Sequence, residues 1–199
     1  MKARKDRDAE SRTGRRAIMI NPDAAIQQRL ALGFGLDRYA AIMRRFPNVD
    51  VSKDRDFQRL FNGFYRVRRN ETWRDAFYAL FQRVRDARPT FEDILTALYD
   101  KTGRVEASFA SKMLATLDPD KPIWDKYALI NLGIAVPDKN KDAPLTGIVD
   151  AYDQIEGWYA SYLTTPNSRR CVRSFDRLMP DYSWISATKK IDFYLWSMR

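Results

Sequence analysis

The chain has 199 residues, of which 45% are hydrophobic and 13% aromatic, so it can bury a core and is too apolar to remain disordered. No stretch approaches the roughly 18 consecutive apolar residues of a membrane span, and no apolar segment follows the charged N-terminus as a secretory signal requires. The single cysteine, Cys171, excludes an internal disulfide and a four-cysteine iron–sulphur or zinc site. These features predict a cytoplasmic protein.

The chain contains no histidine. Catalysis by Ser-His-Asp or Cys-His groups is therefore excluded, as are the zinc sites of deaminases and of HExxH proteases. Any acid–base chemistry must come from Asp, Glu, Lys, Tyr or a bound water. We expect neither a metal nor another cofactor.

The net charge of +9 is unevenly distributed along the chain. Residues 1–17 carry seven Lys or Arg against three acidic residues, whereas residues 113–165 carry four against eight. Segregated positive charge predicts a polyanionic partner, although net charge alone does not identify it. We expect residues 1–17 to form a flexible basic tail and residues 18–199 to form a single helical domain.

Apolar residues recur at helical spacing through most of the chain, and no segment alternates apolar and polar residues as a half-buried strand would. The pattern predicts an all-α fold of about nine or ten helices. In chain order, the expected helices cover residues 23–32, 36–46, 57–65, 73–84, 91–100, 107–117, 126–132, 148–165, 171–179 and 186–197. A loop is expected over residues 137–144.

Local sequence signals predict where several helices begin and end. Thr72, with Asp75 three residues later, is expected to cap the helix that follows it. Thr90 and Asp93 form the same pattern before the next helix. Gly133 is a suitable residue to end a helix in the left-handed conformation.

Residues 101–133 contain a distinctive order of elements. A helix leads into the turn KTGRVE at 101–106, a second helix runs from Ala107 to Leu117, and Ile123-Trp124-Asp125 follows a short loop and opens a further helix. This order resembles the helix-hairpin-helix DNA glycosylase superfamily, in which a Gly-containing hairpin joins two helices and an Asp opens a later one. The resemblance implies two helical lobes with Asp125 in an active-site cleft between them.

Two positions differ from the usual pattern of that superfamily. Val105 occupies the position of the second hairpin glycine. Ala107, 18 positions before Asp125, occupies the position at which lyase-active members carry a nucleophilic lysine. The cysteine quartet of the iron–sulphur members is also missing. The resemblance therefore implies a monofunctional glycosylase that uses water and has no cluster.

The chemistry expected of Asp125 follows from the reaction. A glycosylase flips its target base out of the stack, and departure of the base leaves an oxocarbenium-like sugar. A carboxylate held against that cation stabilises charge that develops in the transition state, and it can orient or deprotonate the attacking water. An Asp directly before a helix is also the ordinary N-cap residue, and the two roles are compatible.

The hairpin is the expected DNA contact. Backbone amides at Gly103 and Val105 would bind a phosphate group, as amides at helix starts do. The glycine taken alone is equally typical of a simple turn at the end of a helix. Lys101, Arg104 and Lys126 would supply further phosphate contacts.

Lys112 is expected to be an exposed helix lysine or a phosphate contact. Its alternative role is that of a nucleophile, since a lysine with a lowered pKa could form a Schiff base with the sugar. It lies five residues after Ala107, about 140° around the helix, and so is not expected to face the point at which the lysine of the family acts.

A second basic segment, residues 66–70 (RVRRN), follows the 57–65 helix. In the resembling family, the end of an early helix often supplies a polar wedge that fills the gap left by the flipped base, and Arg69 or Asn70 could do so here. Tyr65 or Trp124 could stack on the flipped base. The alternative is an ordinary solvated helix end.

The expected function is that of a monomeric DNA glycosylase, which excises a modified base from double-stranded DNA and leaves an abasic site. Relatives in the family act on oxidised, alkylated or deaminated bases, and others excise hypermodified cytosines, such as glucosylated hydroxymethylcytosine, in defence against phages. The missing lysine and the compact size favour the second type. Two alternatives remain, namely a non-catalytic helical module that uses the hairpin only to bind DNA, and a structural protein whose basic surface meets another acidic partner.

Overall fold

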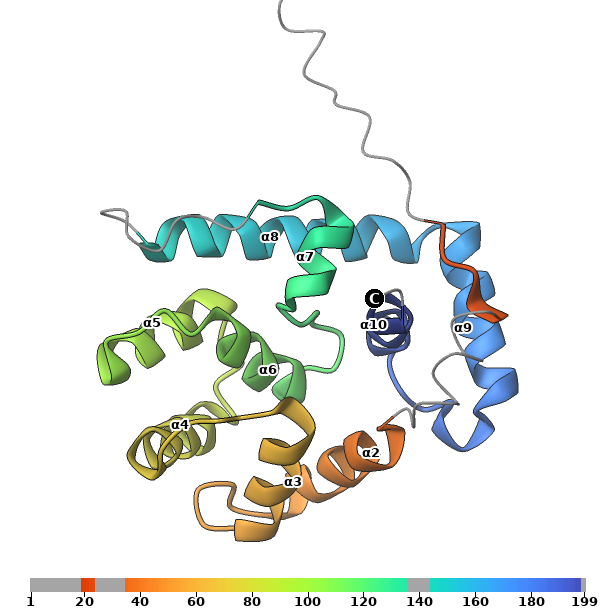
Figure 1. Ribbon diagram of the computed structural model, residues 1–199. Coiled ribbons are helices and arrows are strands. Elements are labelled where there is room, and N and C mark those ends of the chain that lie inside the picture. The colour runs from red at the N-terminus through yellow and green to blue at the C-terminus, as the bar shows by residue number, and fades with distance from the viewer. Residues whose placement is uncertain (1–18, 24–34, 136–143, 198–199) are drawn as a thin grey trace, which may run out of the picture.

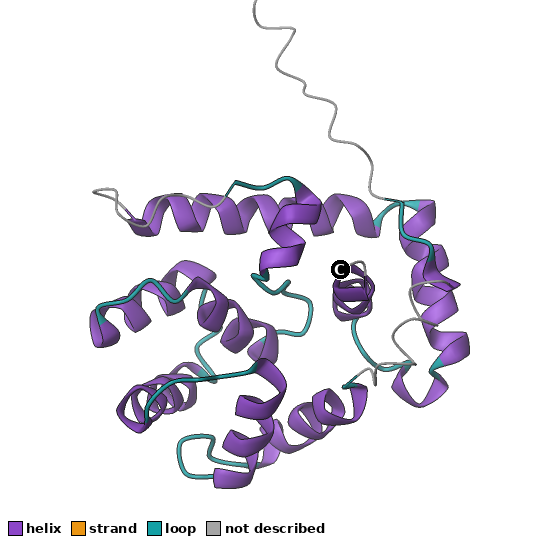
Figure 2. Cartoon of the chain, viewed as in Figure 1, coloured by secondary structure: helices purple, strands orange, loops and turns teal. Residues whose placement is uncertain are grey.

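The computed structural model describes residues 19–23, 35–135 and 144–197. Throughout these ranges the chain is helix or loop without a β-strand, which confirms the predicted all-α class (Figure 2). Nine α-helices are delimited in this part of the chain, with two short 3₁₀ helices at Phe46–Asn48 and Pro180–Tyr182. The α-helices are α2 (Leu36–Arg45), α3 (Arg55–Tyr65), α4 (Glu71–Val84), α5 (Phe91–Thr102), α6 (Ala107–Leu117), α7 (Lys126–Leu132), α8 (Pro144–Leu163), α9 (Pro166–Leu178) and α10 (Ala187–Ser197).

The helices surround a buried C-terminal helix. Figure 1 shows α8 along the top, α9 along the right edge, α2 and α3 below, and α4 and α5 on the left, with α10 inside this ring. Residues 188–195 of α10 are all buried, including two lysines and an aspartate. Burying a charged group is costly unless it is paired, so these lysines and the aspartate of α10 require partners inside the protein.

One continuous core stabilises the described chain. The buried apolar side chains from α2 to α10 form a single cluster, without a separate core for each of two lobes. An aromatic part of it joins α3 to α4, where Phe57, Phe61, Phe77 and Phe81 are fully buried. The Phe61 and Phe81 rings meet edge to face with centroids 5.7 Å apart. Apolar residues four positions apart share one helix face, so the sequence marks the buried face of each of these two helices.

Several helix boundaries agree with the sequence and others do not. The Thr90–Asp93 capping box is present, and Gly133 ends α7 at the predicted residue. The prediction for Thr72 was wrong, because Asn70 caps α4 instead. The helices α8 and α9 begin several residues earlier than predicted, because each begins at a proline, which can occupy the first helical position. The predicted tail 1–17, the helix 23–32 beyond Asp23 and nearly all of the loop 137–144 lie outside the described residues.

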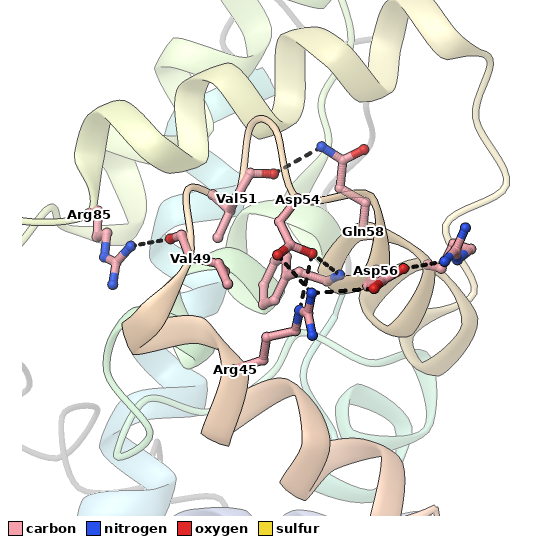
Figure 3. A network of polar contacts seen from close by, with 9 residues as sticks. Arg45, Val49, Val51, Asp54, Asp56, Gln58 and Arg85 are labelled. Carbon is pink, nitrogen blue, oxygen red and sulfur yellow. Dashed lines mark hydrogen bonds and ion pairs between the residues drawn. The ribbon is translucent and has the colours of Figure 1, made fainter.

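A polar network fixes the loop between α2 and α3 (Figure 3). Arg45 donates to both carboxylate oxygens of Asp54 at 3.0 and 2.9 Å, and Asp54 in turn accepts from the Phe57 amide at 2.7 Å. Gln58 donates to the Val51 carbonyl at 2.9 Å, so side chains satisfy the backbone of this loop.

Within the described part of the chain, no helix has the length and apolar character that crossing a membrane demands.

Candidate nucleic-acid interface and the Asp125 region

The hairpin between α5 and α6 is shorter than predicted, because α5 continues through Lys101 and Thr102. Gly103 then adopts a left-handed conformation (φ 63°), and its amide donates to the Tyr99 carbonyl at 2.7 Å. The Thr102 hydroxyl donates to the Leu98 carbonyl at 2.7 Å and accepts from the Arg104 amide at 3.3 Å. The turn is therefore held by its own hydrogen bonds before any ligand binds.

A surface groove brings the hairpin together with the 66–70 segment. Its volume is about 430 Å³. Both basic segments that the sequence singled out line it, although more than 30 residues separate them. Its basic members Arg68, Lys101 and Arg104 are exposed, and no carboxylate lines the groove. A concave surface with unbalanced positive charge favours a polyanion. The lining residues are Arg68, Arg69, Asn70, Thr72, Trp73, Ala76, Lys101, Thr102 and Arg104.

Arg69 does not project as a wedge. Its Nη2 atom lies 2.9 Å from each carboxylate oxygen of Glu106 and donates to Oε2. The guanidinium also lies over the rings of Trp73 and Phe109, at 5.8 and 5.4 Å from their centroids. Asn70 likewise has a structural role, since its side chain accepts from the Trp73 amide at 3.0 Å as the N-cap of α4. The wedge prediction overlooked Glu106, the acidic residue within the basic hairpin.

Neither predicted stacking ring is available to a base in this structure. Tyr65 is 4% exposed and Trp124 is 7% exposed, and both belong to the core cluster. The Trp124 ring lies parallel to that of Phe91 with centroids 6.5 Å apart, and its amide donates to the Ser111 hydroxyl at 2.9 Å. The sequence shows that such rings are apolar, but it does not show that the helices bury them on every side.

The remaining hairpin predictions divide between surface and core. Gly103 is exposed at the turn, and Lys126 is exposed at the first position of α7. The Val105 side chain is half-buried and packs against the core, so that only its backbone belongs to the hairpin surface. Ala107 is buried in the core at the start of α6.

Asp125 is the N-cap of α7. Its Oδ1 atom accepts a hydrogen bond from the Tyr127 amide at 2.9 Å, and the side chain is half-buried. None of five cavities found over residues 19–23, 35–135 and 144–197 is lined by Asp125. The capping role is therefore present, and the expected cleft is not among these cavities. Burial lowers the pKa of Lys112 and of Lys189, and the charge of Asp125 partly opposes this lowering in both lysines.

Lys112 is neither an exposed lysine nor a surface phosphate contact. Its Nζ atom donates to the Tyr65 carbonyl at 3.3 Å and lies 5.1 Å from the centroid of the Phe109 ring. Burial lowers the pKa of Lys112 to about 8, and the charge of Lys189 acts in the same direction, whereas that of Asp125 opposes it. The surface prediction failed because most of α6 is buried, leaving little exposed face at this position.

The buried ion pair in α10 was not predicted from the sequence. The Nζ atom of Lys189 lies 3.3 Å from the carboxylate of Asp192, which also accepts a hydrogen bond from Tyr159. The amine lies 4.7 Å from the centroid of the Trp196 ring. Burial lowers the pKa of Lys189 and raises that of Asp192, because both charged forms lose hydration. An i, i+3 Lys–Asp pair in the sequence resembles an ordinary surface pair, so only the packing reveals its burial.

A further cavity of about 690 Å³ lies between the α4–α5 link, α6 and α8. Its lining mixes acidic and basic groups, and its Lys121 is already paired with Glu156 at 2.9 Å. Such a surface does not favour a polyanion, so it is not the candidate interface.

No protein-family model matches the chain, and searches of curated proteins and of solved structures give no match.

Proposed function

We propose that the protein is a DNA glycosylase that flips a modified base out of double-stranded DNA and hydrolyses its bond to the sugar. The observation that carries the proposal is the basic, carboxylate-free groove shared by the hairpin and the 66–70 segment. Lys112 connects this region to Asp125, because its amine bonds to the carbonyl of Tyr65, directly before that segment, and responds to the charge of Asp125.

In this proposal the groove holds the DNA backbone and Asp125 performs the chemistry. Arg68, Lys101 and Arg104 contact phosphates, and the Gly103 turn allows the DNA backbone to approach closely. The Asp125 carboxylate, oriented by the Tyr127 amide, opposes the positive charge that develops on the sugar and orients the attacking water. None of the five cavities found among the described residues reaches Asp125, so a flipped nucleotide can reach it only if a cleft forms around α7 when DNA binds.

We further propose that the enzyme is monofunctional and acts as a monomer in the cytoplasm. Ala107 carries no amine at the position of the lyase lysine, and it is buried in the core. For the substrate we propose a hypermodified cytosine, such as a glucosylated one in phage DNA, as the first modified base to test.

A second candidate is a non-catalytic helical module that binds DNA through the same groove. It is favoured by the observation that Asp125 caps α7 and lines none of the five cavities described for residues 19–23, 35–135 and 144–197. Both candidates require DNA binding, and they differ in whether abasic sites appear.

The experiment uses the full chain and duplexes that carry different modified bases, with phage DNA included, and it measures abasic sites. Asp125→Asn separates the chemistry from the capping role, because its amide oxygen can still cap α7. It should abolish base release while leaving DNA affinity and stability nearly unchanged. Thr165→Ala is the matched control, since it removes an N-cap hydrogen bond at α9 without touching the proposed site.

Release at the wild-type rate by Asp125→Asn would overturn the proposed mechanism. If the wild-type protein binds these duplexes and releases no base from any of them, the non-catalytic candidate is correct. Salt-insensitive, weak binding would argue against a DNA partner altogether.

A further inference from the structure

Three arginines on α9 form a second basic cluster, which we call the α9 cluster. Arg170, Arg173 and Arg177 lie three and four residues apart and therefore share one face of the helix. With Ser174 and Asp23 they line a surface cavity of about 390 Å³. In Figure 1, α9 occupies the right edge of the molecule, far from α4 and α5 on the left, between which the hairpin groove lies.

The α9 cluster carries more positive charge than its surroundings neutralise. Asp23 is its one acidic member, at 3.9 Å from Arg170 and 3.7 Å from Arg177, and these arginine side chains remain 64% and 71% exposed. Among the described residues Arg173 pairs with no carboxylate. The other acid of α9, Asp176, pairs with Lys190 at 2.6 Å instead. Three cations against one anion leave a surplus of two positive charges.

The position of Asp23 shows that this cavity accepts an oxyanion. Its carboxylate lies between two guanidinium groups and also accepts a hydrogen bond from the Ser174 hydroxyl at 3.1 Å. Ile20 anchors the 19–23 segment through contacts that do not involve the arginines. Ile20 is buried, and its amide and carbonyl bond to the side chain of Asn167 at 3.1 Å each.

We propose that the α9 cluster is a second phosphate-binding surface, which contacts DNA outside the hairpin groove. Arginine binds phosphate oxygens through paired N–H donors, which favours it over lysine in such sites. Arg170 and Arg177 are about 10 Å apart along the helix axis. This span can meet more than one phosphate of a strand, where successive groups follow at about 3.4 Å along the duplex axis. The choice of DNA as the polyanion rests on the proposed function.

The test measures the affinity of the full chain for a duplex of about 40 base pairs, roughly 136 Å long, as a function of salt concentration. Replacing the three arginines by Gln should reduce the slope of log affinity against log salt by roughly two to three, since each phosphate contact contributes about 0.9. A control with the same loss of charge elsewhere should change the slope by less than one. The control replaces Lys53, Arg83 and Arg88 by Gln.

Asp23→Asn should change DNA affinity in the opposite direction from the triple arginine variant. It removes the carboxylate that competes with phosphate, so it should tighten DNA binding roughly two- to five-fold at low salt. If the arginines serve only to anchor Asp23, this variant would lower thermal stability and leave DNA affinity unchanged. Circular dichroism and thermal unfolding check that each variant is folded.

The inference is overturned if the triple variant keeps the wild-type slope, or if it loses no more than the control. It is also overturned if the variant loses binding to phosphatidylserine vesicles and not to DNA, since the cluster would then face a membrane surface. These outcomes are independent of the hairpin groove. Loss of DNA binding in Arg104→Gln with an unaffected triple variant would leave the proposed function standing while removing this inference.

Discussion

Arg69 and Glu106 join the two segments of the proposed DNA-binding groove through an ion pair between residues 37 positions apart. The Nη2 atom of Arg69 is 2.9 Å from both oxygens of a carboxylate that is almost fully buried. Two buried atoms of this pair, Nε of Arg69 and Oε1 of Glu106, have no hydrogen-bond partner. The pair therefore lacks full compensation for its lost hydration, and a bound phosphate could attract Arg69 away from it.

Glu106→Ala should lower the free energy of unfolding by about 2–4 kcal/mol, because it leaves the partly buried guanidinium of Arg69 without its partner. Urea unfolding measures this change. The matched control is Glu92→Ala in the first turn of α5, where the side chain is exposed and the change should stay below about 0.5 kcal/mol. Glu106→Gln should also tighten DNA binding, since it removes a negative charge beneath the groove. Unchanged stability in Glu106→Ala would contradict this account of the pair.

Gly103 and Gly133 form a matched pair for testing whether the hairpin touches DNA. Both have φ near +63° at the end of a helix, and a Cβ atom at either position would meet nothing within 4 Å. Each Gly→Ala change should therefore cost about 1 kcal/mol from left-handed backbone strain alone. Only Gly103→Ala should also weaken DNA binding, because a methyl group would stand between the turn and a phosphate. Equal DNA affinities for the two variants would remove the hairpin from the interface.

The helices were largely predictable because local signals determine them. The capping box at Thr90 and the glycine at 133 depend on neighbouring residues, and the apolar spacing of Phe57 and Phe61 marks a buried face directly. The starts of α8 and α9 were missed because each helix begins at a proline, four or five residues before the apolar residue at which its predicted range began.

The site was predictable only in part, for a different physical reason. Runs of charge and a glycine in the chain indicated the two segments that line the groove. The contacts that define their chemistry join distant residues, such as Lys112 to the carbonyl of Tyr65, 47 positions away. Periodicity does not encode such pairs, and the buried Lys189–Asp192 pair even mimics a surface pattern.

Borohydride treatment of the protein with abasic DNA at pH 7 should trap no covalent complex. Ala107 offers no amine, and the amine of Lys112, although burial lowers its pKa to about 8, is held inside the protein by its hydrogen bond to the Tyr65 carbonyl. Gel electrophoresis measures the trapped fraction. A complex that forms in the wild-type protein and disappears in Lys112→Met would show that Lys112 acts as a lyase and would contradict the monofunctional proposal.

The contribution of Lys112 to the stability of the protein should rise with pH between about 8 and 10.5. Burial lowers the pKa of this lysine from 10.5 to about 8 in the folded state. In that pH window this lysine binds more protons in the unfolded chain than in the folded one, so its contribution to the free energy of unfolding increases with pH. The gain is at most about 3 kcal/mol, since each pKa unit corresponds to about 1.4 kcal/mol.

The measurement compares urea unfolding of the wild-type protein and Lys112→Met at pH 7 and pH 10. The wild-type protein should gain stability relative to the variant across this range, because the variant has no amine to lose its proton. Asp125→Asn should lower the pH at which this gain in stability begins. The carboxylate of Asp125 opposes the lowering of the Lys112 pKa by burial, and the variant removes it. A constant difference between wild type and Lys112→Met at both pH values would mean that the amine is hydrated in the folded protein. The electrostatic link between Asp125 and Lys112, on which the proposed site depends, would then be lost.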